Sequence, residues 1–260
     1  MNHADPSLTP SSVQLKGVGS MQATAIAGHY SQTLNLGLTP STVKAPTVEL
    51  PGAALNLACR RLEARQPLYL AGQPVLSLFL IRAGQMKTSV VSHDGRELIT
   101  GFRMRGDWLG LESLDTDFYA CDAVALEFCE VLELPRSRID ALQESHPNLK
   151  RELTSTLSQE IRRDWQWMLR TATLAAEQRV AAFLLDLASR QRALGFSARR
   201  LTLRMTRAEL GSFLAITLET VTRVMSRMAE HGVISVQRRD VELLDPDALG
   251  ALAGGTATYH

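Results

Sequence analysis

Hydrophobic positions follow one period up to about residue 135 and a different period beyond it. Between 55 and 135, short apolar runs such as 76–81, 86–91 and 97–102 are separated by turns that contain glycine. Runs of this length at such intervals predict antiparallel strands in a sandwich or barrel. Gly95, between two of the runs, can adopt the positive φ of a tight hairpin turn. We expect a last strand over 126–134, in which Glu130 interrupts the apolar face.

Beyond residue 135 the period becomes helical. Apolar residues recur every four positions and predict a helix of about six turns with one apolar stripe. The stripe consists of Leu149, Leu153, Leu157, Ile161 and Trp165, followed by Met168, Leu169 and Ala172. Its partner is either the rest of its own domain or the same helix of a second copy, in a seam like that of a coiled coil. The spacing leaves both alternatives open.

Two short helices are predicted within 205–232. Thr206 and Glu209 have the spacing of a capping box, which starts the first helix. Thr217 is an N-cap candidate for the second helix, and Gly232 can end it in a left-handed conformation. Two helices joined by so short a turn describe a helix-turn-helix.

The second of these helices has two distinct faces when its residues are placed at 100° intervals. The apolar face comprises Val221, Val224, Met225 and Met228. The opposite face comprises Glu219, Thr222, Arg223 and Ser226. Glutamate can accept a hydrogen bond from cytosine, arginine can bind guanine through two bonds, and threonine can contact the thymine methyl group. This face favours base recognition in a major groove, although a merely solvated face has the same composition.

A second hairpin, at 233–244, carries Arg238 and Arg239 at its tip. A basic tip beside a helix-turn-helix suits contact with phosphates, which positions a protein on DNA without reading sequence. Without the neighbouring helices it would be an ordinary charged turn. We expect backbone contacts from Thr206, Thr217, Ser226, Arg238 and Arg239. Sixteen basic and twelve acidic residues within 146–260 agree with a polyanionic partner, although the net charge of the whole chain is +1.

Composition narrows the class of protein further. A chain with 45% hydrophobic and 21% charged residues is typical of soluble globular proteins. It contains neither an apolar run long enough to cross a membrane nor a secretory signal, so we expect a cytoplasmic protein. Residues 1–50 are rich in Ser, Thr, Pro and Gly and are expected to form a disordered arm. The three cysteines lack C-x-x-C spacing and are expected to be buried apolar residues. No motif indicates an enzyme.

The order of these parts resembles the CRP/FNR family of bacterial transcription regulators, and the FNR branch most closely. The stretches that carry the resemblance are 71–72, 80–84, 94–102 and 106–110, and above all MTRAELG at 205–211 followed by TLETVTR at 217–223. The resemblance covers about residues 60–253. It implies an α+β chain with an antiparallel β-roll, like the jelly roll of cyclic nucleotide-binding domains, at 51–137. A dimerisation helix at 138–172 and a winged helix-turn-helix at 173–260 would follow.

The resemblance also implies a homodimeric transcription factor that binds double-stranded operator DNA, in which Glu219 and Arg223 read G·C pairs. Thr222 stands where FNR-like members carry a serine that helps to select a TTGAT-type half-site. Leu218 stands where cyclic-AMP-responsive members have a further arginine for a TGTGA-type half-site. We therefore expect an inverted repeat of TTGAT-like half-sites.

In activators of this family, one surface of the β-roll contacts RNA polymerase. We expect that contact at the exposed hairpin turn, through His93, Asp94 and Arg96. The effector, in contrast, is not indicated by the resemblance.

The FNR-type iron–sulfur cluster takes four cysteines, three of them ahead of the β-roll, where this chain has none, and Leu132 stands at the internal position. Tyr119 and Ala120 align with the Arg-Ser pair that binds phosphate and ribose in cyclic-nucleotide-binding members. We expect neither an FNR-type cluster nor a cyclic AMP site. Haem is a further alternative, although His93 and His146 fall in segments expected to be solvated. The alternative function is a haem- or nucleotide-sensing module whose C-terminal helices mainly bind protein.

Overall fold

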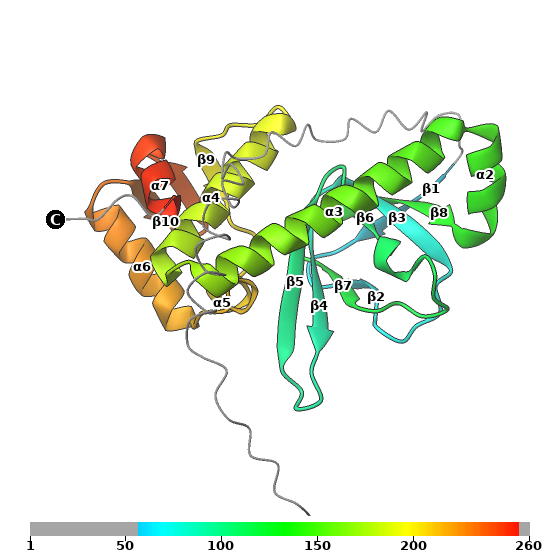
Figure 1. Ribbon diagram of the computed structural model, residues 1–260, viewed down its shortest axis with the longest axis horizontal. Helices are drawn as coiled ribbons and strands as arrows, with labels where there is room; N and C mark the ends of the chain where they lie inside the picture. Colours follow the sequence, from blue (N-terminus) through cyan, green and yellow to red (C-terminus); the bar gives the residue numbers. More distant parts are fainter. Residues whose placement is uncertain (1–56, 255–260) are drawn as a thin grey trace, which may run out of the picture. The chain divides into compact units, whose positions relative to one another are not determined.

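Eight short strands form two antiparallel sheets in the first part of the described chain (Figure 1). The strands are β1 (Ala58–Leu62), β2 (Pro67–Tyr69), β3 (Ser77–Ala83), β4 (Gln85–Val91), β5 (Glu97–Met104), β6 (Trp108–Leu109), β7 (Asp122–Ala125) and β8 (Cys129–Pro135). One sheet has the order β1-β8-β3-β6 and the other β2-β7-β4-β5. This confirms the predicted antiparallel β-roll. The computed structural model describes residues 57–254, so the expected arm at 1–50 lies outside the described residues.

Strand β3 is buried on both of its faces. Phe79 and Ile81 lie in the cluster between the two sheets, whereas Leu78 and Leu80 lie in a second cluster beneath the helices that follow. A strand enclosed on both sides has an unbroken apolar run instead of strict alternation. This explains the run at 76–81, of which only Leu76 is strongly exposed.

The last strand is shorter than the sequence pattern predicts. It begins at Cys129, not at residue 126, and Phe128 is 49% exposed. Cys129 and Val131 face the interior of the roll, while Leu134 faces the cluster under the helices. Glu130, unexplained by the pattern, forms an ion pair of 3.1 Å with Arg61, which lies opposite it on β1.

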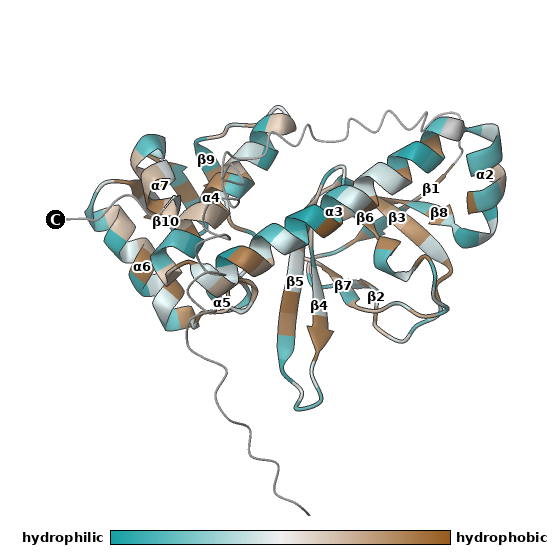
Figure 2. Ribbon diagram, in the orientation of Figure 1, coloured by the Kyte–Doolittle hydropathy of each residue, from teal (hydrophilic) through white to brown (hydrophobic). Residues whose placement is uncertain are grey.

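Two helices follow the β-roll: α2 (Ile139–Ser145) and α3 (Pro147–Thr173), with the 3-10 turns η1 (Leu111–Ser113) and η2 (Arg136–Arg138) before them. The predicted long helix is confirmed, and Figure 2 shows the mixture of polar and apolar residues along it. Leu149 and Leu153 are buried against α2 and the outer face of β3, and Leu157 packs against the same cluster. These three residues thus contact their own domain, which is one of the two alternatives that the sequence leaves open, and their role in a dimer interface stays a prediction.

The second half of α3 has a different environment. Ile161, Trp165, Met168 and Leu169 are 43%, 63%, 66% and 41% exposed. Their spacing of four, three and one residues places them within one face of the helix. The apolar stripe is thus covered at one end of α3 and uncovered at the other.

The remaining elements form the C-terminal domain around a single core. They are α4 (Ala176–Ala193), β9 (Arg200–Thr202), α5 (Arg207–Leu214), α6 (Leu218–Glu230), β10 (Ile234–Gln237), β11 (Asp240–Leu243) and α7 (Pro246–Ala253). The sheet has the order β10-β11-β9, so the predicted hairpin gains a third strand from before the helix-turn-helix. Three residues of β5, Ile99, Phe102 and Met104, belong to the same core.

Ion pairs join β5, α3 and α4 where the β-roll meets this domain. Arg103 pairs with Glu160 at 2.8 Å, and Arg163 pairs with Asp186 at 3.1 Å. Asp107 pairs with Arg190; burial alone would raise the pKa of Asp107, but Arg190 holds it below its ordinary value. These contacts leave the buried charges paired, as burial requires.

No helix within 57–254 is long and apolar enough to cross a membrane.

Candidate nucleic-acid interface

The helix-turn-helix is held by side chains close in sequence. The hydroxyl of Thr206 accepts a hydrogen bond from the Glu209 amide at 3.1 Å, and the Glu209 carboxylate accepts one from the Thr206 amide at 2.7 Å. The Thr217 hydroxyl accepts from the Thr220 amide at 3.2 Å and caps α6. Gly232, just beyond α6, has a φ of +69°. The predicted capping box, second N-cap and left-handed stop are confirmed.

The turn between the two helices is tight. Ala215 occupies the left-handed region with a φ of 53°, and a Cβ on Gly211 would lie 2.7 Å from the Ile216 carbonyl oxygen. Only glycine fits so close to that carbonyl. From α4, the Arg179 guanidinium donates to the carbonyls of Leu214 and Ala215 at 3.0 and 3.2 Å. Arg179 was missed by our sequence analysis, because its partners lie 35 and 36 residues further along the chain.

Helix α6 separates its faces as predicted. Val221, Val224, Met225 and Met228 are each at most 4% exposed. The face with the candidate DNA-binding residues is exposed and comprises Glu219, Thr222, Arg223 and Ser226. An amphipathic helix with a buried apolar face can present its other face to a groove without loss of core contacts.

The chemistry of this exposed face suits hydrogen bonding to bases. The amide of Glu219 itself and the Thr217 hydroxyl hold the pKa of Glu219 below its ordinary value, so at neutral pH it is a hydrogen-bond acceptor. Arg223 has no ion pair within the described residues, and all its donors are available. The Thr222 hydroxyl donates to the Leu218 carbonyl at 2.9 Å, which leaves its oxygen as an acceptor and its methyl group for apolar contact.

The basic hairpin lies beside these helices. Arg238 and Arg239 are exposed at its tip, and Arg238 has a φ of 57°, which a residue with a side chain rarely adopts. The amide of Leu203, next to β9, donates to the Arg239 carbonyl at 2.8 Å and ties the tip to the third strand. The structure thus brings both arginines to the edge of the helix-turn-helix domain.

Contacts between β4, β5 and α5 link the β-roll to the helix-turn-helix. The Ser212 hydroxyl accepts from the Ile99 amide at 3.1 Å and donates to the Glu97 carbonyl at 3.2 Å. Lys87 of β4 pairs with Glu209 at 3.0 Å and with Glu97 at 2.8 Å. Because Glu209 also belongs to the capping box, one carboxylate connects the strand pair to the start of α5. No sequence signal indicated this link, since its partners are more than 100 residues apart.

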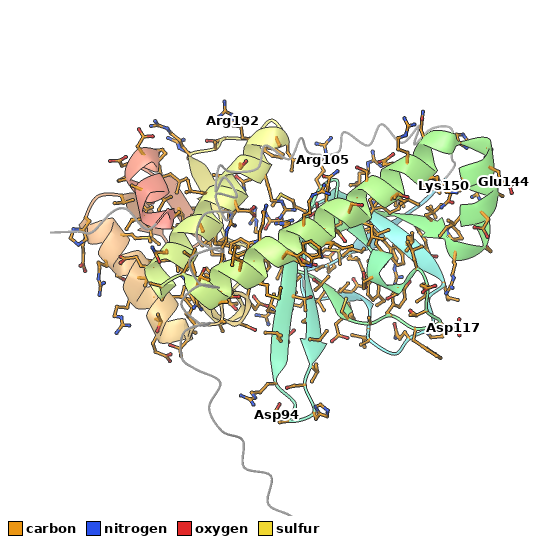
Figure 3. The ribbon with its side chains drawn as sticks, viewed as in Figure 1. Asp94, Arg105, Asp117, Glu144, Lys150 and Arg192 are labelled. Carbon is orange, nitrogen blue, oxygen red and sulfur yellow. The ribbon has the colours of Figure 1, made fainter. Side chains whose placement is uncertain are left out.

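The β4–β5 turn extends away from these contacts. His93, Asp94 and Arg96 are exposed, Gly95 has the predicted positive φ of +79°, and Figure 3 shows Asp94 at the tip of the hairpin. Arg96 donates to Asp94 at 2.6 Å, and this bond lowers the pKa of Asp94. The tip is available to a partner.

The residues of the β-roll do not fit a cyclic nucleotide. The ring of Tyr119 stacks on Tyr69 with their centroids 3.8 Å apart, and its hydroxyl donates to the Ser77 carbonyl at 2.6 Å. The Ala120 amide donates to the Ser113 hydroxyl at 3.0 Å. Tyr119, which the resemblance aligns with the phosphate-binding arginine, thus carries no positive charge and is held in an aromatic stack. Arg103, which lies near Tyr69, is already paired with Glu160.

The cysteines do not fit an FNR-type cluster either. The whole sequence has three cysteines where such a cluster needs four thiolates. Cys121 and Cys129 are buried, and burial raises the pKa of Cys121 to about 12 and that of Cys129 to about 11. Cys59 is exposed, which corrects our expectation that all three are buried. Within the described residues, no three His, Cys, Asp or Glu side chains could hold a metal ion together.

Comparisons with known proteins agree with this arrangement. Residues 59–146 match the family of cyclic nucleotide-binding domains, and residues 178–252 match the Crp-like helix-turn-helix domain. The chain is 42% identical over 196 residues to the transcriptional activator protein anr of Pseudomonas aeruginosa, a match covering 75% of this chain and 80% of that protein. It is 36% identical over 191 residues to the fumarate and nitrate reduction regulatory protein of Salmonella typhimurium, covering 74% and 76%.

Among solved structures, the chain is similar to FixK2 from Bradyrhizobium japonicum, with a TM-score of 0.69 and 25% identity. That similarity covers 78% of this chain and 99% of FixK2. Both halves of the fold described above are therefore found together in a solved protein.

Proposed function

Because the chain belongs to the CRP/FNR family of DNA-binding transcription regulators, we propose that it binds, as a homodimer, an inverted repeat of TTGAT-like half-sites. Glu219, Thr222 and Arg223 contact base edges in the major groove. Thr206, Thr217, Ser226, Arg238 and Arg239 contact the DNA backbone. The observation that carries the proposal is the exposed polar face of α6 opposite a fully buried apolar face.

The chemistry of α6 supports this division of roles. Glu219 is ionised and accepts from cytosine, Arg223 is unpaired and can donate twice to guanine, and Thr222 offers a methyl group to thymine. Leu218, at the first position of α6, is 45% exposed and carries no donor for a further guanine. This favours the TTGAT-type over the TGTGA-type half-site.

The exposed half of α3 supports the homodimer. Four residues of the predicted apolar stripe are exposed in this half of the helix: Ile161, Trp165, Met168 and Leu169. Four large apolar side chains on one face of one helix suit the same face of a second copy, because burying them removes apolar surface from water. Two copies joined along α3 would present two α6 helices to an inverted repeat.

The experiment is a titration of the full chain with a fluorescent TTGAT palindrome at fixed salt, followed by anisotropy. Glu219→Ala and Arg223→Ala should each remove about 1–3 kcal/mol of discrimination per half-site, at the G·C pair that each side chain contacts. Glu230→Ala, which removes an exposed carboxylate at the other end of α6, is the matched control. Specific binding that survives the Glu219→Ala, Arg223→Ala double substitution contradicts the assignment of the site.

The same titration tests the backbone contacts. Replacing Arg238 and Arg239 by glutamine should weaken binding to all sequences alike and make the salt dependence shallower by about 3–4 units of log–log slope for a dimer. A change in base preference would contradict the phosphate role of these arginines.

We also propose that the β4–β5 turn contacts RNA polymerase through His93, Asp94 and Arg96, and that the protein activates transcription. The exposure of these side chains supports this role. Alanine at His93 and Asp94 should abolish transcription in vitro while operator affinity stays unchanged. Loss of both activities together would contradict the proposed polymerase contact.

We assign the protein to the cytoplasm and give it no catalytic role, as its relatives are named as transcription regulators.

A further inference from the structure

A basic cleft lies apart from the exposed face of α6. Its walls come from the β3–β4 turn, the end of β5, the segment before β8, the last turn of α4 and strand β9. Its volume is about 460 Å³, which is within the range of pockets that hold small ligands. The β-roll and the winged helix-turn-helix domain therefore share one cleft.

Charge is distributed unevenly around this cleft. Arg82, Arg105, Arg200 and Arg204 line it, and Glu127 is its only acidic lining residue. Arg204 pairs with Glu127 at 3.0 Å. Arg200 pairs with Glu242 at 3.4 Å, but both side chains are largely exposed, so that pair contributes little.

The two arginines from the β-roll are free to bind an anion. Arg82 and Arg105 are exposed and have neither an ion pair nor a hydrogen bond within the described residues. Figure 3 shows Arg105 on the same side of the molecule as Arg192 of the last turn of α4. With Arg200 and Arg204 already paired, Arg82 and Arg105 contribute the unpaired positive charge at this cleft. Phosphate is the anion whose geometry guanidinium matches best.

The cleft also has a platform for a planar ring. Phe196 lines it and is 58% exposed, although a large aromatic side chain is normally buried. The loop that carries Phe196 is held by local hydrogen bonds, since the Ser197 hydroxyl accepts from the amides of Arg199 and Arg200, both at 3.2 Å. Gln191 and Thr202 add hydrogen-bonding groups to the lining.

The β3–β4 turn, which forms another wall, is closely packed. Gly84 has a φ of +87°, and a Cβ there would lie 2.5 Å from the Phe128 carbonyl oxygen and 2.6 Å from the Cys129 sulfur. The β3–β4 turn, two residues beyond Arg82, is thus packed directly against the start of β8. A preformed site binds its ligand at a lower cost in ordering.

We propose that this cleft binds a phosphorylated small molecule with a planar ring, such as a nucleotide, through Arg82, Arg105 and Phe196. The phosphates bind the two arginines and the ring lies against Phe196. The ligand bridges the β-roll to β9, whose Thr202 pairs with Asp240 of β11. The site is separate from the position in the β-roll that Tyr69 and Tyr119 fill, and it does not depend on which operator sequence the protein binds.

The test is calorimetry on the purified full chain at fixed ionic strength, with ADP, inorganic pyrophosphate and adenosine as probes. ADP should bind most tightly, pyrophosphate more weakly, and adenosine weakest of all. The Arg82→Gln, Arg105→Gln double substitution should weaken ADP and pyrophosphate binding by about tenfold or more. Phe196→Ala should weaken ADP binding and leave pyrophosphate binding unchanged.

The matched control is Arg60→Gln with Arg151→Gln, which removes two exposed arginines from β1 and α3. Equal weakening by the control and the cleft variant would mean that only the net charge matters, and it would overturn the proposal. So would an absence of binding by ADP and pyrophosphate at millimolar concentration. The cleft variant could instead keep its ADP affinity and show a shallower salt dependence of operator binding. That result would overturn the proposal and indicate that Arg82 and Arg105 contact the DNA backbone. Thermal unfolding of each variant shows that it is folded.

Discussion

The hydroxyl groups of Thr206, Thr217 and Thr222 are all engaged within the helices that carry them. Thr206 and Thr217 accept hydrogen bonds from backbone amides, and Thr222 donates to the Leu218 carbonyl. The hydrogen of Thr206 is also donated to the Glu209 carboxylate, at 2.9 Å. Under the proposed roles, a phosphate that binds at Thr206 would have to compete with that carboxylate, whereas the unpaired Arg223 would bind a base without such competition. A backbone contact through the Thr206 hydroxyl would therefore break an existing hydrogen bond, whereas a base contact through Arg223 would break none.

The three thiols should differ in reactivity. Cys59 is exposed, whereas burial raises the pKa of Cys121 to about 12 and that of Cys129 to about 11. Because the thiolate is the reactive form, a thiol-specific chromogenic reagent at pH 8 should modify one cysteine rapidly in the native chain and all three after denaturation. Cys59→Ser should abolish the rapid phase. Rapid modification of Cys121 in the native protein would contradict its burial.

Helix α3 has two different environments along its length. Its first half is buried on the β-roll, and its second half has an apolar face without cover in the single chain. An apolar stripe in a sequence indicates that one face of a helix is covered. It does not indicate whether the chain's own domain or a second copy covers that face. The sequence therefore left the two alternatives open for the whole helix. In the structure the first half contacts its own domain, and the second half is uncovered in the single chain.

Charge placed on the exposed half should prevent dimerisation. Trp165→Glu with Met168→Glu puts four carboxylates into a seam of two helices, and burying unpaired charges is strongly unfavourable. Light scattering after gel filtration should give the mass of a monomer, and affinity for the palindrome should fall towards that for one half-site. Gln166→Glu, which is exposed on the same helix but off the stripe, should leave the dimer intact. A dimeric Trp165→Glu, Met168→Glu variant would mean that α3 is not the seam.

Elements with local signals were predictable. The caps at Thr206 and Thr217, the turn at Gly95 and the faces of α6 depend on residues within one or two turns of each other. Strand β9, the Arg179 contacts and the start of β8 were not predictable in the same way. β9 is only three residues long, and it is defined by a partner strand about 40 residues later. The start of β8 was misplaced because the strand is covered on both faces, so its residues do not alternate simply.

At the scale of the whole molecule, the β-roll and the DNA-binding domain share a core and a set of polar contacts. Phe102 of β5 packs edge-on against Phe213 of α5, with centroids 5.3 Å apart, beside the Lys87–Glu209 pair. A change in the β-roll can therefore reach α5 through direct contacts. This is a direct physical connection between the two parts.

The Lys87–Glu209 pair should couple the two domains measurably. Burial raises the pKa of Glu209, but the Thr206 amide and Lys87 outweigh it and hold the pKa below 4.5, so the pair's stabilisation is present at neutral pH and is lost as the pH falls through that lowered value. Burial likewise lowers the pKa of Lys87, but Glu97 and Glu209 raise it above 10.5, so the lysine stays charged until strongly alkaline pH. Lys87→Gln and Glu209→Gln should lower operator affinity non-additively, with a coupling of about 1 kcal/mol. Additive effects, or thermal unfolding that stays unchanged as the pH falls from 7 to well below 4.5, would contradict the link.

The order of strands in the C-terminal sheet has a consequence for shortened chains. β11 lies between β9 and β10, and Leu249 and Leu252 of α7 fill the same core as the apolar face of α6. A chain truncated directly after α6 would keep Glu219 and Arg223 but would lack β11 and α7, and so part of the core on which α6 packs. Such a fragment should not compete with the full chain for DNA, because nothing fixes the orientation of its exposed α6 face.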